Sequence, residues 1–181
     1  MRCEKPARAR RTACVIRLAH PEDLPALVDV EVEAGALFRE VGMAAIADDD
    51  PGSVAELAAY QSAGRAWVSV DAENRPVGYL VADVVDGCAH IEQVSVRPSH
   101  ARRGIGRALI ETLAEWAAEC GLPALTLTTF ESVPWNAPYY ERLRFRVIPD
   151  AEIGAGLRSI RRAEAARGLD TWPRVAMIRP L

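Results

Sequence analysis

The chain has 181 residues and a mass of 19.7 kDa, with 26% charged and 50% hydrophobic residues. A chain of this length buries about 70% of the surface of its unfolded state, so it can form a core without disulfides or metals. The four cysteines are scattered and form no CxxC pair, which disfavours a metal site and indicates reduced thiols in a cytoplasmic protein.

Charge is distributed unevenly along the chain. Residues 1–12 carry five basic side chains and one acidic one, a net charge of +4, whereas the rest carries 17 basic and 24 acidic side chains, a net charge of -7. We therefore expect a disordered basic arm at 1–12 and a single folded domain at 13–181. The acidic body argues against a nucleic-acid partner. A membrane partner is not expected either, because no apolar run approaches the ~18 residues of a membrane span.

Hydrophobic periodicity and turn residues predict alternating strands and helices. The expected elements, in chain order, are a strand at 14–18, a helix opening at 20–23, a helix from 53 to about 63, strands at 66–70, 77–85 and 89–96, a helix at 104–120, a strand at 125–128, a helix at 134–143, a strand at 145–148, a helix at 152–167 and a strand at 175–178. The strand–helix–strand crossover beside hairpin-connected strands predicts an α/β fold with a mixed sheet.

Two details of this pattern are specific. Asp86-Gly87 predicts a tight hairpin between two strands. In the strand that follows, Ile91 has an odd number while Val94 and Val96 have even numbers, so a strict two-residue period cannot place them on one face. A bulge near Glu92-Gln93 would do so. In the helix at 104–120, an apolar stripe is expected at Ile105, Leu109, Leu113, Trp116 and Cys120.

The segment after that strand, Arg102-Arg103-Gly104-Ile105-Gly106-Arg107, indicates an anion site at a helix N-terminus. The backbone N–H groups there are unpaired, and glycines let an anion approach closely. Leu109 stands where a dinucleotide fingerprint needs a third glycine, and Arg107-Ala108 stands where a P-loop needs Lys-Ser/Thr, so neither motif is present. The alternative is a glycine-bearing loop with solvated arginines.

Two segments resemble the GNAT superfamily of N-acetyltransferases. Residues 94–98 with 102–109 resemble its acetyl-CoA loop, and residues 140–145 resemble its Tyr-x-x-x-Gly-Phe segment. The resemblance implies a mostly antiparallel central sheet with helices on both faces. It also implies acetyl-CoA as co-substrate, no metal, and transfer of the acetyl group to a primary amine of a small molecule or peptide.

The resemblance also implies roles for individual residues. The backbone of Val94, Ser95 and Val96 would pair with the pantetheine arm, and a bulge would free an N–H, at Val94, to polarise the thioester carbonyl. Asn136 would contact the same arm. The pyrophosphate would be cradled by Arg102, Arg103, Gly104, Ile105, Gly106 and Arg107.

Two side chains are candidates for proton transfer. Tyr140 matches the tyrosine that protonates the departing CoA thiolate, which is uphill by only about 2 kcal/mol from the reference pKa values. A core aromatic is the alternative for Tyr140, and Tyr139 is a rival donor. Glu92 could accept the proton of the amine, or it could be an ordinary strand carboxylate while solvent takes the proton.

Departures from the family pattern keep other functions open. Ala101 stands where Gln or Arg is usual, Arg144 replaces the glycine before Phe145, and Asn136 lies four rather than seven residues before Tyr140. A different acyl-CoA donor and a non-catalytic CoA-binding sensor are the alternatives, and a homodimer is possible by analogy with the family.

A group of acidic residues lies before the central strands. These residues either favour a cationic amine as acceptor or form a solvated surface: Glu31, Glu33, Glu40 and Asp48-Asp49-Asp50.

Overall fold

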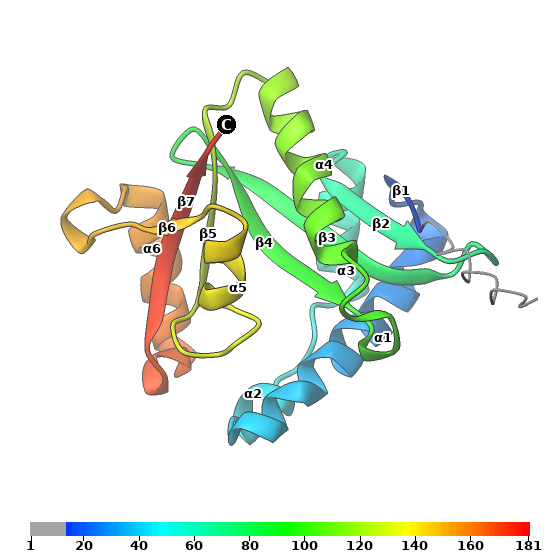
Figure 1. The fold of residues 1–181 in the computed structure, drawn as a ribbon, viewed down its shortest axis with the longest axis horizontal. Coiled ribbons are helices and arrows are strands. Elements are labelled where there is room, and N and C mark those ends of the chain that lie inside the picture. The colour runs from blue at the N-terminus through cyan, green and yellow to red at the C-terminus, as the bar shows by residue number, and fades with distance from the viewer. Residues whose placement is uncertain (1–13) are drawn as a thin grey trace, which may run out of the picture.

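The computed structural model describes residues 14–181 and contains one seven-stranded sheet with the order β1-β2-β3-β4-β5-β7-β6 (Figure 1). The strands are β1 (Val15–Leu18), β2 (Ala66–Val70), β3 (Pro76–Val85), β4 (Cys88–Val96), β5 (Ala124–Phe130), β6 (Arg146–Val147) and β7 (Arg174–Pro180). The helices are α1 (Leu24–Gly35), α2 (Ala44–Ala47), α3 (Val54–Ser62), α4 (Ile105–Glu119), α5 (Ala137–Arg142) and α6 (Ala155–Ala166). The expected basic arm lies outside the described residues.

The sheet is mixed and mostly antiparallel, as expected. Only β4 and β5 pair in parallel, and α4 makes the crossover between them. The other neighbouring strands pair antiparallel. Between residues 14 and 181 no helix is both long and apolar enough to cross a membrane.

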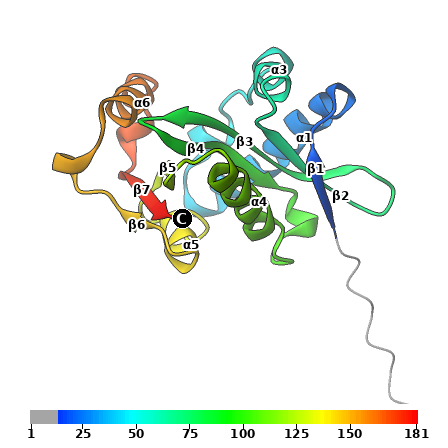
Figure 2. The same cartoon turned by 90° about the horizontal axis from the view of Figure 1, so that it is seen from above.

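Helices cover both faces of the sheet. Figure 2 shows α4 and α5 on one face and α1, α3 and α6 on the other. Each face has its own core. The α4 side buries Leu80, Ile91, Leu109, Leu113 and Leu127, and the α1 side buries Leu27, Val30, Val68, Tyr79 and Val81. Alternation along β3 supplies both cores, since Tyr79 and Leu80 point to opposite faces.

The apolar stripe predicted for α4 is confirmed over most of the helix. Ile105, Leu109 and Leu113 are buried, and Trp116 packs edge-on against Trp67 with ring centroids 5.6 Å apart. The expectation for Cys120 is wrong: it is exposed, because the helix ends at Glu119 and Cys120 forms its C-terminal cap.

The predicted hairpin and bulge are both confirmed. Asp86 and Gly87 have φ of 50° and 75°, and they join the paired residues Val85 and Cys88. In the β3–β4 ladder, Val81 pairs with Gln93 and Ala82 with Ile91, so Glu92 has no partner in β3. One extra residue in β4 therefore shifts the alternation, and Ile91, Val94 and Val96 all pack in the α4-side core.

Several boundaries differ from the sequence-based expectation. The sequence left the end of the first helix open; α1 ends at Gly35, and Ala36–Val41 forms a 3-10 helix followed by the four-residue α2, which was not predicted. α5 begins at Ala137 rather than 134, and β6 has only two residues. Such short elements have too few turns to show a clear hydrophobic period.

The hairpin also holds α6 in place. The Asp86 carboxylate accepts hydrogen bonds from the backbone N–H of Gly156, at 2.8 Å, and of Leu157, at 3.0 Å, in the first turn of α6. These bonds lower the pKa of Asp86, so its contribution to stability is present at neutral pH and is lost as pH falls through that lowered pKa.

We predict that Asp86→Ala lowers the free energy of unfolding by about 1 kcal/mol, the usual contribution of a capping side chain. Asp86→Asn is the matched control, because asparagine tolerates the left-handed backbone and keeps one acceptor oxygen. Urea unfolding at pH 7 measures both. Equal losses in the two variants would mean that the carboxylate does not act as the cap.

Candidate active site

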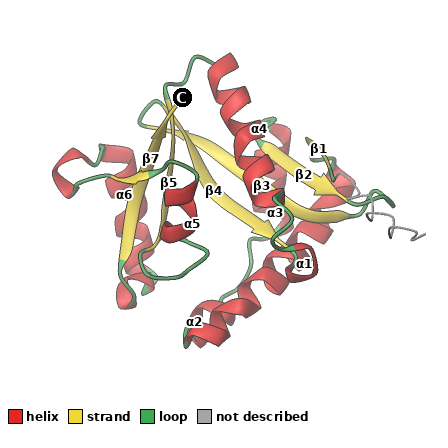
Figure 3. Ribbon diagram, in the orientation of Figure 1, coloured by secondary structure: helices red, strands yellow, loops and turns green. Residues whose placement is uncertain are grey.

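The two parallel strands β4 and β5 separate after a short contact. Their pairing covers Ala89, His90 and Ile91 of β4 and ends where Ile91 pairs with Leu127. Beyond that point β4 continues along β3 to Val96, while β5 continues along β7 to Phe130. Figure 3 shows the two strands fanning apart, with α5 over the gap. Within residues 14–181, no strand pairs with β4 from Glu92 to Val96 on its β5 side, so the backbone there can receive an extended ligand.

Glu92 lies at the top of this gap, in the bulge. Its side chain reaches solvent. The surrounding protein nevertheless partly desolvates the carboxyl and, with the charges of Asp83 and Glu164, raises its pKa. The raised pKa makes the Glu92 carboxylate a better proton acceptor than that of an ordinary glutamate.

The three predicted pantetheine-binding residues follow the bulge. Val94 and Val96 are half-buried against the α4-side core, and Ser95 is buried and accepts a hydrogen bond from the Gln93 side chain at 2.9 Å. Their side chains are thus engaged within the protein. Recognition of a ligand by this segment would therefore depend on the backbone.

The predicted anion-binding turn follows β4 and opens α4. Arg102 and Gly104 have left-handed φ of 59° and 85°, which reverses the chain before the first helical residue, Ile105. Arg103 donates to the Ser99 carbonyl at 3.1 Å. The guanidinium groups of Arg102, Arg103 and Arg107 belong to exposed residues, and Ile105 anchors the turn in the core. Free N–H groups at this helix end therefore lie among several positive charges.

The neighbouring tyrosines of α5 lie in different surroundings. Tyr140 is buried, with its ring edge-on to Phe145 at 5.6 Å, and burial raises its pKa well above the ordinary value. Tyr139 points toward the start of α4. Its hydroxyl would lie 3.1 Å from a Cβ placed on Gly106. The sequence offered no means of telling the two orientations apart.

Asn136 forms the N-terminal cap of α5 and faces β5. Its Nδ2 donates to the Thr129 hydroxyl at 2.7 Å, while its Oδ1 is buried and has no hydrogen-bond partner among the described residues. A buried acceptor without a partner is costly unless a donor arrives from elsewhere.

Three of the six acidic residues noted in the sequence are paired with cations. Glu33 bonds Arg97, Asp48 bonds Arg39, and Asp49 bonds Arg167. Glu31 accepts a hydrogen bond from the Tyr79 hydroxyl at 2.6 Å. Half of these charges are therefore compensated, which weakens the electrostatic argument for a cationic acceptor.

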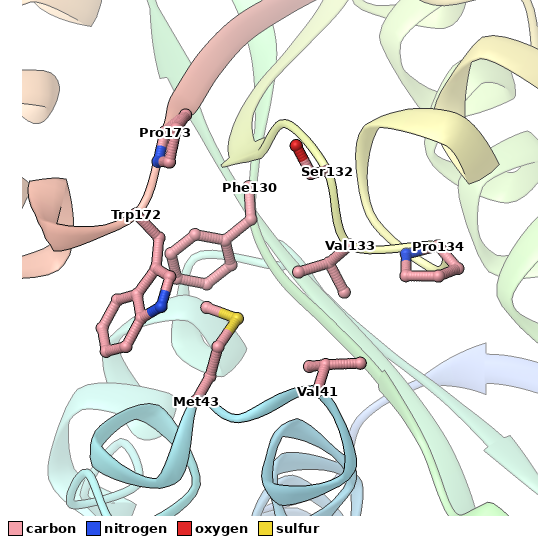
Figure 4. Close-up of a pocket in the computed structure, with 8 residues that line it drawn as sticks. All are labelled: Val41, Met43, Phe130, Ser132, Val133, Pro134, Trp172 and Pro173. Atoms are coloured by element: carbon pink, nitrogen blue, oxygen red, sulfur yellow. The ribbon is translucent and has the colours of Figure 1, made fainter.

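An apolar cavity of about 170 Å³ lies at the far end of β5. Figure 4 shows Phe130, Met43 and Trp172 pointing toward one another, with Val41 and Val133 completing the apolar walls. Ser132, Pro134 and Pro173 form the rest of its lining. The residues come from three distant segments, so the periodicity of the sequence could not bring them together. Among residues 14–181, no group of three or more His, Cys, Asp or Glu could hold a metal ion.

Comparison with known proteins identifies the class to which this arrangement belongs. Residues 35–145 match the Acetyltransferase (GNAT) family, and the chain belongs to that family. This span includes the bulged strand, the arginine-rich turn and α5.

Solved structures share the fold at low sequence identity. The ribosomal-protein-S18-alanine N-acetyltransferase of Escherichia coli is 20% identical, with a TM-score of 0.63 over 93% of this chain and 94% of its own. A Mycobacterium tuberculosis protein in complex with CoA is 21% identical, with a TM-score of 0.67 over 92% and 99%. An N-acetyltransferase of Thermoplasma acidophilum in complex with coenzyme A is 14% identical, with a TM-score of 0.65 over 93% and 99%.

We predict that Gly106→Ala weakens CoA binding roughly tenfold, equivalent to about 1.4 kcal/mol. The new methyl group would crowd the Tyr139 hydroxyl and the space above the first turn of α4. Gly35→Ala is the matched control, because it also lies in a helix and its Cβ would meet nothing within 4 Å. Isothermal titration with CoA measures the affinity. Equal affinities for both variants would show that no ligand approaches Gly106.

Proposed function

We propose that this protein transfers the acetyl group of acetyl-CoA to a primary amine by direct attack. The observation that carries the proposal is the unpaired edge of β4, which runs from the bulge at Glu92 to Val96 and is followed by the anion-binding turn at Gly104. A thioester, an extended amide-containing arm and a pyrophosphate occur in that order along acetyl-CoA. The chain offers a polarising bulge, a free strand edge and a cationic helix N-terminus in the same order.

Donor binding would use these features in turn. The backbone of Val94, Ser95 and Val96 would hydrogen-bond the amides of the pantetheine arm, and the partnerless Oδ1 of Asn136 could accept another amide N–H. The pyrophosphate would lie against the N–H groups of residues 104–107, with Arg102 and Arg103 nearby.

The reaction requires two proton movements. The lone pair of a neutral amine attacks the thioester carbonyl carbon and forms the C–N bond, while a backbone N–H at Val94 stabilises the developing oxyanion. The C–S bond then breaks, and the thiolate takes the hydroxyl proton of Tyr140. Glu92, directly or through water, takes the proton that the amine nitrogen loses.

The acceptor would enter from the end of the gap opposite the pyrophosphate turn. The apolar cavity beside Phe130 supports an amine attached to a small apolar group, either on a small molecule or at a peptide terminus. Comparison of apolar and polycationic amines as acceptors tests this preference.

Release of free thiol from acetyl-CoA, measured against a panel of amines, tests the activity. We expect amine-dependent release that falls ten- to a thousandfold in Tyr140→Phe, on the general-acid scale. Tyr139→Phe is the matched control, because it removes a hydroxyl one residue away and should reduce turnover much less. The reverse order would transfer the acid role to Tyr139.

Two other results would replace the proposal. Amine-dependent release from a different acyl-CoA, but not from acetyl-CoA, would change the donor. Tight CoA binding without release for any amine would indicate a sensor rather than an enzyme.

The raised pKa of Glu92 predicts a pH dependence. A base acts only when deprotonated, so activity should be full above this pKa and decline as pH falls through it. We expect the acid limb of the profile of kcat against pH to lie above the range of an ordinary glutamate, and Glu92→Gln to lower kcat about a hundredfold and abolish that limb. An unchanged profile in Glu92→Gln would show that solvent takes the proton.

A further inference from the structure

A buried ion pair lies beside the apolar cavity, where the start of β7 meets the last turn of α6. Arg174 is the first residue of β7 and directly follows Pro173 of the cavity lining. The side chains of Arg174 and Glu164 are only 9% and 13% exposed. The Nη2 and Nε atoms of Arg174 donate to the two carboxylate oxygens of Glu164 at 2.7 and 3.2 Å. This forked geometry fixes the plane of the guanidinium group.

Further contacts hold Glu164 in place. Its carboxylate accepts hydrogen bonds from the Thr128 hydroxyl and, at 2.7 Å, from Arg161. Arg161 in turn bonds Asp170 at 3.0 Å. Burial alone would raise the pKa of Glu164, but the hydrogen bonds from Arg174 and Thr128 help to lower it below its ordinary value, so this carboxylate is ionised at neutral pH. The cluster contains two arginines and two acidic side chains, so its charges balance and Arg174 is held in one position.

Arg174 covers one wall of the cavity from behind. It pairs with Phe130 across β7 and β5, and its guanidinium carbon lies 4.4 Å from the centre of the Phe130 ring. Cations are attracted to the face of an aromatic ring. Phe38 and Trp172 pack edge-to-face with the same ring, with centroids 5.6 and 6.3 Å away. The plane of the Phe130 ring is therefore fixed by three neighbours, of which Arg174 is the one anchored by ion pairs.

A fixed ring matters because the cavity is apolar and open. Phe130 lines it together with Met43 and Trp172 (Figure 4). Protein interiors are close-packed, and side chains around a void relax into it as far as their own packing permits. A Phe130 ring that cannot rotate keeps the space available for a ligand. Since the ionic cluster behind the ring has balanced charges, the cavity would select a ligand by its apolar area and shape.

We propose that Arg174 is a positioning residue that sets the acceptor selectivity of this protein by holding Phe130 as a rigid cavity wall. The inference rests on the proposed function, because the cavity takes part in the reaction only if the apolar group of the amine enters it. Arg174 acts through the Phe130 ring and moves no proton. Its loss would let the ring turn into the cavity, which weakens binding of amines with a larger apolar group and leaves the chemical step unaffected.

Thiol release from saturating acetyl-CoA, measured with isopentylamine and with ethylamine, tests the inference. The two primary amines have nearly equal basicity and differ in the size of the apolar group. We expect the wild-type kcat/KM to be about tenfold or more higher for isopentylamine. Arg174→Met should lower this ratio about fivefold by raising the KM for isopentylamine, with kcat for both amines unchanged. A purely structural role would instead lower kcat for both amines alike.

Arg179→Met is the matched control. Arg179 also lies in β7, is 10% exposed and donates to the Glu111 carboxylate at 3.0 and 3.1 Å. Its guanidinium carbon lies 5.5 Å from the centre of the Phe145 ring, which belongs to the α4-side core rather than to the cavity. The control therefore breaks an equivalent ion pair and ring contact, and it should leave the ratio between the two amines unchanged.

Arg174→Lys guards against loss of the fold in Arg174→Met. Lysine keeps a cation beside Glu164 but lacks the flat, forked guanidinium, so the ratio should fall in the same direction, about twofold or more. The melting temperature of each variant shows whether it is folded.

Four results would overturn the inference. An unchanged ratio in the folded Arg174 variants would show that the ring needs no support. Equal losses in Arg174→Met and Arg179→Met would attribute the effect to general loosening of the protein. Turnover of both amines by the wild type with a ratio near one would leave the transfer activity intact and remove the cavity from acceptor binding. If no amine of the wider panel released thiol, the proposed function itself would be wrong, and this inference would fail with it.

Discussion

The candidate site depends on the short length of the parallel pairing between β4 and β5. Three residues of each strand pair in parallel, and then each strand follows its other neighbour. The remaining backbone groups of β4 are left without a strand partner on that side, an arrangement that a folded protein tolerates only where water or a ligand satisfies them. The bulge at Glu92 coincides with this parting, so the local twist increases where the strands must diverge. The gap between the strands and the carboxylate at its edge therefore have one structural cause.

Charge is distributed unequally between the two ends of the gap between β4 and β5. At the α4 end, several guanidinium groups lack carboxylate partners within the described residues, whereas most acidic side chains of the α1–α2 region are held by arginines or a tyrosine. Positive charge is thus unpaired at the α4 end, whereas acidic charge is partly compensated at the other end. In the proposed donor complex, this asymmetry would orient a long ligand with one charged end.

The sequence predicted those elements that show a regular hydrophobic period. The odd-to-even change between Ile91 and Val94 revealed the bulge, and the apolar spacing from Ile105 to Trp116 revealed α4. It left the end of the first helix open and did not predict α2, because such short helices show no period. It also could not bring together the distant segments that form the cavity beside Phe130. The ion pair between Glu111 and Arg179 was equally hidden, because it joins residues that are 68 positions apart.

A sequence motif also could not predict which of the two tyrosines of α5 is buried. Successive residues in a helix differ in direction by about 100°, so Tyr140 lies within the core while Tyr139 packs against its edge and points toward α4. Burial of Tyr140 raises its pKa, which by itself makes it a weaker acid. In the proposed reaction, desolvation would also raise the pKa of the departing thiol, because both anions lose water. The pKa difference between the tyrosine and the thiol would then change little, and Tyr140 would stay protonated until the thiolate forms.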